Sequence, residues 1–348
     1  MSALDKSALD NLKEFWSSEY FCYTDGDKKV VFGDYQKWYE WAKRSLTRVI
    51  HPEDRVYLKK KGINLKKDAP QLLGYANGML WGNKLEKKSK KRYPSVPHAY
   101  FGNVNNASEV KVVILAINPK YRNANETKPK DTYDNIVRPL DTLLFQQRAE
   151  GVFPWAEDRH WVDIEKDNCF IGKDFDWHKR FTSTKFQENW GVPVEAENIL
   201  QVELFPYPSV NAFEDLDECM QEFKGMNPDN VLPSQELAWE VVKELLEAQE
   251  KPIFISALDT FKYVVESCNR LGEGKDLSEA FARSTLIPKN WGRIPSSVKI
   301  GYQYMTGEDY LEASKGKIRD YCKRNKEDIH DNALRLVESW IESWKKKR

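Results

Sequence analysis

The residues with the clearest chemical potential follow one apolar run. Lys111-Val-Val-Ile-Leu-Ala-Ile117 stops at Asn118-Pro119. A run that is apolar on both faces is typical of an inner strand in a covered parallel sheet, and proline ends such a strand. Ligands of open α/β sheets bind beyond the carboxyl ends of the strands. Asn118 is therefore placed where such a fold does its chemistry, and its amide can orient water but cannot act as a strong base. The alternative is a plain Asn-Pro turn.

Aromatic residues follow a second expected strand, 198–205, in the segment Phe205-Pro206-Tyr207-Pro208. Tyr121 lies just after the first strand. Aromatic rings at a strand end can stack on a flat ligand such as a base, or they can pack in the core. Both interpretations are open for Phe205, Tyr207 and Tyr121.

Positive charge is local rather than global. The chain carries 54 Lys and Arg against 54 Asp and Glu, so no net field indicates a nucleic-acid partner. Lysines are nevertheless concentrated in 59–61, 66–67 and 84–92. Such runs form either solvated loops or contacts with phosphate groups. The second interpretation assigns DNA contact to Lys87, Lys88, Lys90 and Lys91.

The elements around these residues alternate. Strands are expected at 112–117, 198–205, 252–256 and, less regularly, 298–304. Helical spacing of apolar residues is found in 8–17, 35–50, 131–148, 234–249, 261–268 and 307–345, with Ser234 as a plausible N-cap. Strands separated by helices predict a parallel sheet covered on both sides. We expect a mainly helical N-terminal extension over 1–93, an α/β domain over 94–306 and a C-terminal helical segment over 307–348.

Composition excludes several classes of protein. The five cysteines form no CxxC pair, which argues against zinc or iron–sulfur sites and against a disulfide framework. No apolar stretch reaches membrane-spanning length, and the first residues lack the features of a secretory signal. The sequence predicts a cytoplasmic protein with no zinc or iron–sulfur site and no membrane partner.

Four blocks in order resemble a divergent bacterial branch of the uracil-DNA glycosylase superfamily. They span roughly residues 95 to 291. The blocks are Pro97-His-Ala-Tyr-Phe-Gly-Asn103 before the Asn118 strand, Glu203-Leu-Phe-Pro-Tyr-Pro-Ser209, Leu232-Pro-Ser-Gln235, and Ala282-Arg-Ser-Thr-Leu-Ile-Pro-Lys-Asn290.

The resemblance implies a three-layer α/β/α fold with a central, mostly parallel, four-stranded sheet. It implies a monofunctional DNA glycosylase that hydrolyses the N-glycosidic bond of a flipped base without a metal or cofactor, leaving an abasic site in DNA. Asn118 matches the position that holds the catalytic water. Glu203 or Phe205 falls nearest the residue that reads the base.

The last block resembles the loop that enters the DNA groove and supports the departing base. Arg283, Asn290 and Lys120 could supply hydrogen-bond donors to the leaving base, which is anionic as it departs. Arg122 and Ser284 are expected to contact DNA. Lys120, Tyr121, Phe205 and Tyr207 are expected to line the base pocket with Glu203.

The chain departs from the family pattern at three places. Lys120 replaces the usual glycine after Asn-Pro, the last block lacks a histidine, and Glu203 replaces the amide that reads uracil in many members. A carboxylate accepts hydrogen bonds and suits an exocyclic amine, so a modified cytosine is one expected substrate. Repair of damaged bases and excision of hypermodified bases from phage DNA, as antiviral defence, are both expected roles.

Two other functions are compatible with the same residues. One is a nucleic-acid-binding module that has kept the fold and lost the chemistry. The other is a nucleoside hydrolase on a similar sheet, for which the basic runs would be dispensable.

Overall fold

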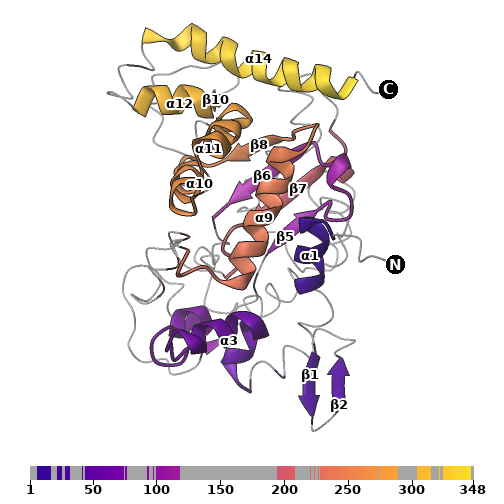
Figure 1. Ribbon diagram of the computed structural model, residues 1–348, viewed down its shortest axis with the longest axis vertical. Coiled ribbons are helices and arrows are strands. Elements are labelled where there is room, and N and C mark those ends of the chain that lie inside the picture. Colours follow the sequence, from indigo (N-terminus) through magenta and orange to yellow (C-terminus); the bar gives the residue numbers. More distant parts are fainter. Residues whose placement is uncertain are drawn as a thin grey trace, which may run out of the picture.

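A computed structural model describes residues 6–16, 22–25, 28–31, 41, 44–73, 75–76, 92–93, 97, 99–117, 194–207, 220, 223, 226, 228–272, 274–288, 304–314, 321 and 324–345. Within these residues the chain is an α/β protein built on one six-stranded sheet (Figure 1). The order across the sheet is β10-β9-β8-β6-β7-β5. The strands are β5 (Tyr100–Gly102), β6 (Val112–Ala116), β7 (Ile199–Glu203), β8 (Ile253–Ser256), β9 (Thr285–Pro288) and β10 (Tyr304–Thr306).

The four inner strands are parallel, and an antiparallel strand closes each edge. β6 pairs in parallel with β7 on one side and β8 on the other, and β8 pairs in parallel with β9. β5 runs antiparallel to β7, and β10 runs antiparallel to β9. The sheet is therefore mostly parallel, as the sequence predicts, but it has six strands instead of four.

Three of the four expected strands are confirmed as β6, β7 and β8, and the fourth, 298–304, lies outside the described residues except for its last residue. The fourth parallel strand is β9, whose Thr-Leu-Ile-Pro sequence has only two central aliphatic residues and no long apolar run. Of the expected strand 298–304 the structure describes only Tyr304, which begins the antiparallel strand β10. β9 is stabilised by pairing with a strand on each side, and this pairing cannot be recognised from the apolar pattern of the segment itself.

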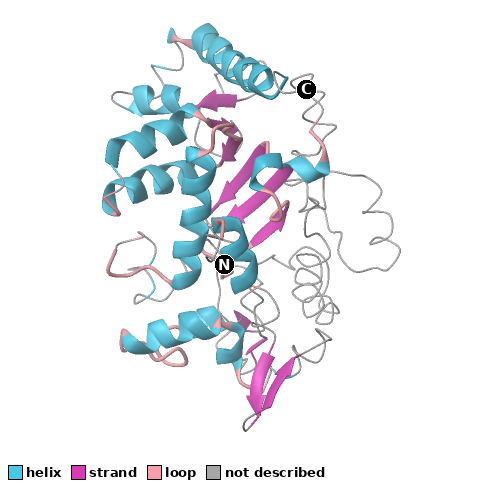
Figure 2. Cartoon of the chain, turned by 45° about the vertical axis from the view of Figure 1, so that its right-hand side comes forward, coloured by secondary structure: helices cyan, strands magenta, loops and turns pink. Residues whose placement is uncertain are grey.

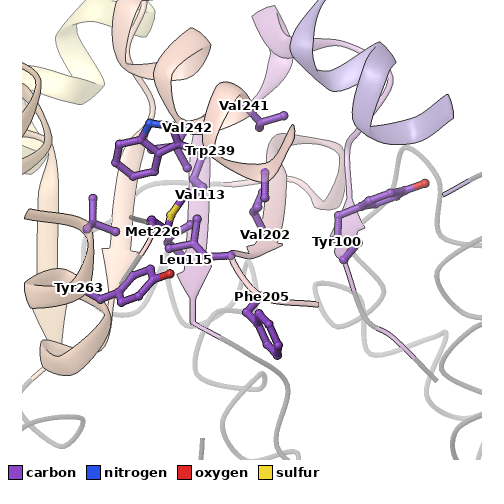
Figure 3. Close-up of a cluster of buried hydrophobic side chains, with 14 of the residues drawn as sticks. Tyr100, Val113, Leu115, Val202, Phe205, Met226, Trp239, Val241, Val242 and Tyr263 are labelled. Carbon is purple, nitrogen blue, oxygen red and sulfur yellow. The ribbon is translucent and has the colours of Figure 1, made fainter. Parts of the chain in front are cut away.

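Helices pack on one face of the inner strands. They are α1 (Ala8–Phe15), α9 (Pro233–Glu247), α10 (Leu258–Arg270) and α11 (Gly274–Arg283). Side chains from these helices form one buried cluster with Val113, Leu115, Leu200, Val202 and Phe254 of the strands. Figure 2 shows helices stacked along this face, and Figure 3 shows Trp239 and Val242 of α9 against Val113 and Leu115 of β6.

The opposite face of the strands is buried as well. Val112, Ile114, Ile199, Ile253 and Ile255 alternate with the residues of the first face and are almost fully buried. Burial on both faces explains why β6 reads as an uninterrupted aliphatic run. The three-layer arrangement itself stays a prediction.

The remaining described elements lie around the sheet. The helices are α3 (Pro52–Lys60), α12 (Gly307–Ser314) and α14 (Lys326–Lys345), with 3-10 turns η1 (Leu46–Val49), η2 (Pro70–Leu73), η3 (Ala107–Glu109) and η5 (Ala196–Asn198). Two small antiparallel pairs are β1 (Cys22–Asp25) with β2 (Lys28–Val31), and β3 (Tyr75–Ala76) with β4 (Arg92–Tyr93). Of the expected helix 35–50, residues 35–40, 42 and 43 lie outside the described residues, and the described end forms the 3-10 turn η1 instead of an α-helix. All of the expected helix 131–148 lies outside the described residues.

The start of α9 differs by two residues from expectation. Leu232 is the N-cap, Pro233 occupies the first helical position and Ser234 lies inside the first turn. The side chain of Gln235 accepts a hydrogen bond from the Leu232 N–H at 3.1 Å. Proline suits this first position because its missing N–H has no partner there in any helix. The start of α9 is therefore determined by Pro233 and Gln235 and not by a serine N-cap.

We expect Gly307→Ala to lower the free energy of unfolding by about 3 kcal/mol, since overpacking a filled core usually costs this much. Gly307 begins α12, and a Cβ there would lie 2.6 Å from Cε2 of Phe261, 2.7 Å from the carbonyl oxygen of Ala282 and 2.8 Å from its Cα. Two of these three atoms are backbone and cannot rotate away. Urea denaturation measures the effect, and exposed Ser314→Ala on the same helix should change it by less than about 0.5 kcal/mol. An unchanged midpoint for Gly307→Ala contradicts the packing.

Candidate functional site

The carboxyl ends of the inner strands lie at one edge of the sheet, which we call the carboxyl edge. β6 ends at Ala116, and its pairing with the β7 segment continues for two more residues. The N–H groups of Leu204 and Phe205 donate to the carbonyls of Ala116 and Ile117 at 2.9 and 2.6 Å. In sequence, Asn118 comes directly after this last paired residue, and Asn290 comes two residues after the end of β9.

Many of the expected site residues lie outside the described residues. These are Asn118, Asn290, Lys120, Tyr121, Arg122, Lys87, Lys88, Lys90 and Lys91. Their roles stay predictions. The described part of the expected site consists of Glu203, Phe205, Tyr207, Arg283 and Ser284.

Glu203 is a buried carboxyl group at the carboxyl edge. It is the last residue of β7, is 4% exposed and lies beside Ala116 of β6 in the parallel register. The Nε2 of Gln201 donates to Oε1 of Glu203 at 2.8 Å. Within the described residues, Oε2 of Glu203 and Oε1 of Gln201 are both buried with no hydrogen-bond partner.

Burial raises the pKa of Glu203 to about 8, and the hydrogen bond from Gln201 opposes this shift only in part. The cause is the loss of hydration of the charged form. Glu203 is therefore predominantly protonated at pH 7. The expectation of an acceptor-only carboxylate is replaced by a neutral acid that offers one O–H donor.

Gln201 and Glu203 form a polar pair on an otherwise aliphatic face. Alternate residues of a strand share a face, so the pair lies on the side of Ile114 and Val112. With Glu203 protonated, the pair offers an O–H donor from Glu203 and a carbonyl acceptor from Gln201. A ligand edge with a carbonyl next to an N–H complements this arrangement. Both side chains are closed to solvent, so such a ligand reaches them only after a local opening.

The structure assigns Phe205 and Tyr207 to packing instead of stacking on a ligand. Both rings are fully buried and contact one another edge to face, with centroids 5.6 Å apart. The hydroxyl of Tyr207 donates to Oδ2 of Asp54 at 2.5 Å and accepts from the N–H of His51 at 3.1 Å. Of the two interpretations open from the sequence, core packing fits both residues.

Tyr207 belongs to a buried polar network that sequence reasoning missed. Oδ1 of Asp54 accepts from the N–H of Ser234 at 3.0 Å, which joins α3 to the start of α9. The His51 ring stacks on Phe15 with centroids 3.5 Å apart, and its Nε2 lies 2.9 Å from the Phe15 carbonyl oxygen. The His-Pro-Glu-Asp sequence at 51–54 has the proline and acidic residues typical of a helix start, although no helix was expected there. Nothing in this sequence shows that His51 and Asp54 are buried.

Burial shifts both groups of this network toward their neutral forms. The pKa of Asp54 is raised to about 6 by desolvation, against hydrogen bonds from Ser234 and Tyr207. The pKa of His51 is lowered to about 3, also by desolvation. The Nδ1 of His51 accepts from the Glu53 N–H at 3.3 Å, so the proton of the neutral ring sits on Nε2 and points to Phe15. These contacts indicate a structural role.

Tyr207→Phe should destabilise the protein by about 2 to 3 kcal/mol at pH 8, because a buried charged acceptor loses its donor. The loss should be smaller at pH 4.5, below the pKa of Asp54, where the neutral carboxyl needs that donor less. A double-mutant cycle tests this interaction. It compares the denaturation of the wild type, Tyr207→Phe, Asp54→Asn and the double variant at both pH values. Additive effects would contradict a direct Tyr207–Asp54 interaction.

Arg283 and Ser284 lie at the opposite edge of the sheet from Glu203. Arg283 ends α11, and the Ser284 carbonyl accepts from the N–H of Phe254 at the amino end of β8. β9 follows at once, so about 10 Å of strand separate these residues from the carboxyl edge. The exposed guanidinium of Arg283 lies 3.5 Å from Glu279. The prediction that Arg283 donates to the departing base beside Asn118 does not fit this arrangement, because Arg283 precedes the buried strand β9 and lies at its amino end. The expected contact of Ser284 with DNA stays a prediction.

No family model, curated protein or solved structure matches this chain. Among the described residues, no cluster of three or more His, Cys, Asp or Glu side chains is arranged to hold a metal ion. None of the described helices is long and apolar enough to cross a membrane.

Proposed function

We propose that this chain is a monofunctional DNA glycosylase that hydrolyses the N-glycosidic bond of a base turned out of the helix. The observation that carries the proposal is the Gln201–Glu203 pair. It is a buried neutral acid and amide beside the strand that leads to Asn118, and one buried oxygen of each has no hydrogen-bond partner among the described residues. The four sequence blocks that resemble the uracil-DNA glycosylase superfamily add support, since Glu203 ends β7 and Asn118 follows the neighbouring strand β6 in the sequence.

In this proposal Asn118 orients the water, and the Gln201–Glu203 pair reads the base. Asn290 and Lys120 supply donors to the departing anionic base. Arg283 has no part in this proposed chemistry, because it lies at the amino ends of the parallel strands, away from the carboxyl edge. An amide is sufficient at position 118 if the glycosidic bond breaks first and the sugar cation then captures the held water.

The protonation of Glu203 points to the class of base. An O–H donor and an amide carbonyl complement a base edge with a carbonyl beside an N–H, as in uracil or hypoxanthine. The exocyclic amine of a modified cytosine, taken alone, needs only an acceptor and would favour the ionised acid. We therefore expect excision of a carbonyl-bearing base to fall as pH rises through about 8, the pKa of Glu203.

A panel of duplexes with single uracil, hypoxanthine or modified cytosines tests the proposal. Alkali cleavage after incubation reveals abasic sites. Cleavage at a carbonyl-bearing base supports the full proposal, and cleavage at modified cytosine alone overturns the assignment of the base. Binding without abasic sites favours the inactive module, and cleavage of free nucleosides alone favours the nucleoside hydrolase.

A further inference from the structure

A run of positive charge surrounds the end of α3 and the turn after it. From Arg55 to Lys67 the sequence contains Arg55, Lys59, Lys60, Lys61, Lys66 and Lys67, without any Asp or Glu. An open hollow of about 480 Å³ lies here, lined by Arg55, Lys59 and Lys66 and by apolar Ile63 and Leu65.

Four of these lysines have no ion-pair partner in the part of the chain that the structure describes. Lys59, Lys60, Lys66 and Lys67 are exposed, and among the described residues no carboxylate pairs with their ammonium groups. We call these four residues the α3 basic surface. Lys61 differs, because its ammonium donates to the Asp229 carbonyl and lies over the Tyr57 ring.

The acid nearest to this surface in the sequence is Asp68, directly after Lys67. Its Oδ2 accepts from the N–H of Asn64 at 2.8 Å. One carboxylate beside four lysines leaves the surface with a net positive charge. A lysine near a helix C-terminus interacts favourably with the helix dipole, and this explains the presence of one or two lysines near the end of α3. It does not account for Lys66 and Lys67, which lie beyond the helix.

The α3 basic surface lies on the same side of the molecule as the candidate site. Asp54 of α3 is bound to Tyr207, which follows β7 at the carboxyl edge, and to Ser234 of α9. Figure 1 shows α3 below the sheet, on the side toward which the arrowhead of β6 points. A polymer bound along α3 therefore passes beyond the strand ends that carry Glu203 and precede Asn118.

We propose that the α3 basic surface binds the phosphodiester backbone of DNA. Closely spaced, unpaired lysines around an open hollow match a polymer that carries a regular series of phosphates, and their binding releases condensed counterions. The inference deepens the proposed function and rests on it for the choice of DNA as the polymer. The backbone contacts are independent of sequence and of the base at the site.

The test measures binding of the full chain to a fluorescent 20-base-pair duplex without any modified base, by anisotropy across 50 to 200 mM KCl. The triple variant Lys59→Gln, Lys60→Gln, Lys66→Gln should bind about a hundredfold more weakly at 100 mM salt, since each lost phosphate contact removes almost one power of the salt concentration. The slope of log K against log salt should fall by about 3.

A matched variant removes the same charge elsewhere. Lys251, Lys262 and Lys275 are exposed lysines before β8, on α10 and on α11. Their triple change to glutamine should leave DNA affinity within about threefold of the wild type, because scattered charges far from the bound polymer are screened by salt. Thermal melting of both variants checks that they are folded.

Three results overturn the proposal. They are unchanged DNA affinity and slope in the α3 variant, an equal loss in the matched variant, and α3-dependent binding to phosphatidylserine vesicles without binding to DNA. The duplex carries no target base, so absence of excision in the panel leaves this inference intact. A loss of binding by the α3 variant likewise leaves the chemistry at Asn118 untested.

Discussion

Glu203→Gln is expected to stabilise the protein by about 3 kcal/mol at pH 7. In the folded state Glu203 has a pKa of about 8, against 4.5 for the ordinary side chain. At pH 7 the unfolded chain carries an ionised Glu203, so folding must take up a proton. Each pH interval of one unit between the two pKa values costs about 1.4 kcal/mol of stability. Glutamine has nearly the same shape and needs no proton.

The sign of the pH dependence is fixed by the raised pKa. The folded protein binds more protons than the unfolded chain between pH 4.5 and 8, so the wild type loses stability as pH rises through this interval. The advantage of Glu203→Gln should therefore be close to zero at pH 4.5 and grow to about 5 kcal/mol at pH 9. Urea denaturation at pH 4.5, 7 and 9 measures the difference at each point.

An exposed glutamate provides the control. Glu247 ends α9 on the surface. Glu247→Gln should change stability by less than about 0.5 kcal/mol, with no trend in pH. If Glu203→Gln is equally stabilising at pH 4.5 and pH 9, or destabilising at all three values, then Glu203 is not a buried neutral acid.

Asn118→Ala is expected to lower the rate of base excision by a factor of about 10² to 10⁴, the usual contribution of a group that positions a reacting water. The amide is assigned to the water and not to the core, so the melting temperature should stay within a few degrees of the wild type. Single-turnover excision on the best duplex of the panel measures the effect. Single-turnover conditions separate chemistry from product release.

Asn118→Asp is the matched variant, because Asp or Asn occupies the corresponding position in the family that the sequence resembles. A carboxylate can also orient water, so this variant should keep substantial activity. Full activity of Asn118→Ala would remove Asn118 from the mechanism. Equal loss in both variants, with unchanged melting, would assign Asn118 to a contact that only an amide can make.

Three of the four inner strands were predictable because burial on two faces favours aliphatic residues at successive positions. β6 and β8 are almost wholly apolar, β7 has aliphatic residues on both sides of Gln201, and α9 and α10 have clear helical spacing. β5 and β9 did not stand out, because Tyr100–Gly102 and Thr285–Pro288 are short segments held by their neighbours. Whether these segments form strands depends on pairing with segments far away in the sequence, which the local residue pattern does not show.

The place of Glu203 at the end of a strand was predictable from the sequence, but its protonation state was not. The end of β7 indicated Glu203, whereas its protonation depends on burial by residues far away in sequence. Gln201 was missed, although a polar residue two positions before Glu203 in an apolar strand signals a shared face. Arg283 was misplaced because the order of blocks does not tell which end of a strand a residue occupies.

The most direct test of the central claim is chromatographic detection of the free base that the full-length protein releases from DNA. The account predicts one free base per modified site, accompanied by an abasic strand of unchanged length, with release greatly reduced by Asn118→Ala. Intact bases across the whole panel, while the protein still binds the same duplexes, would contradict it.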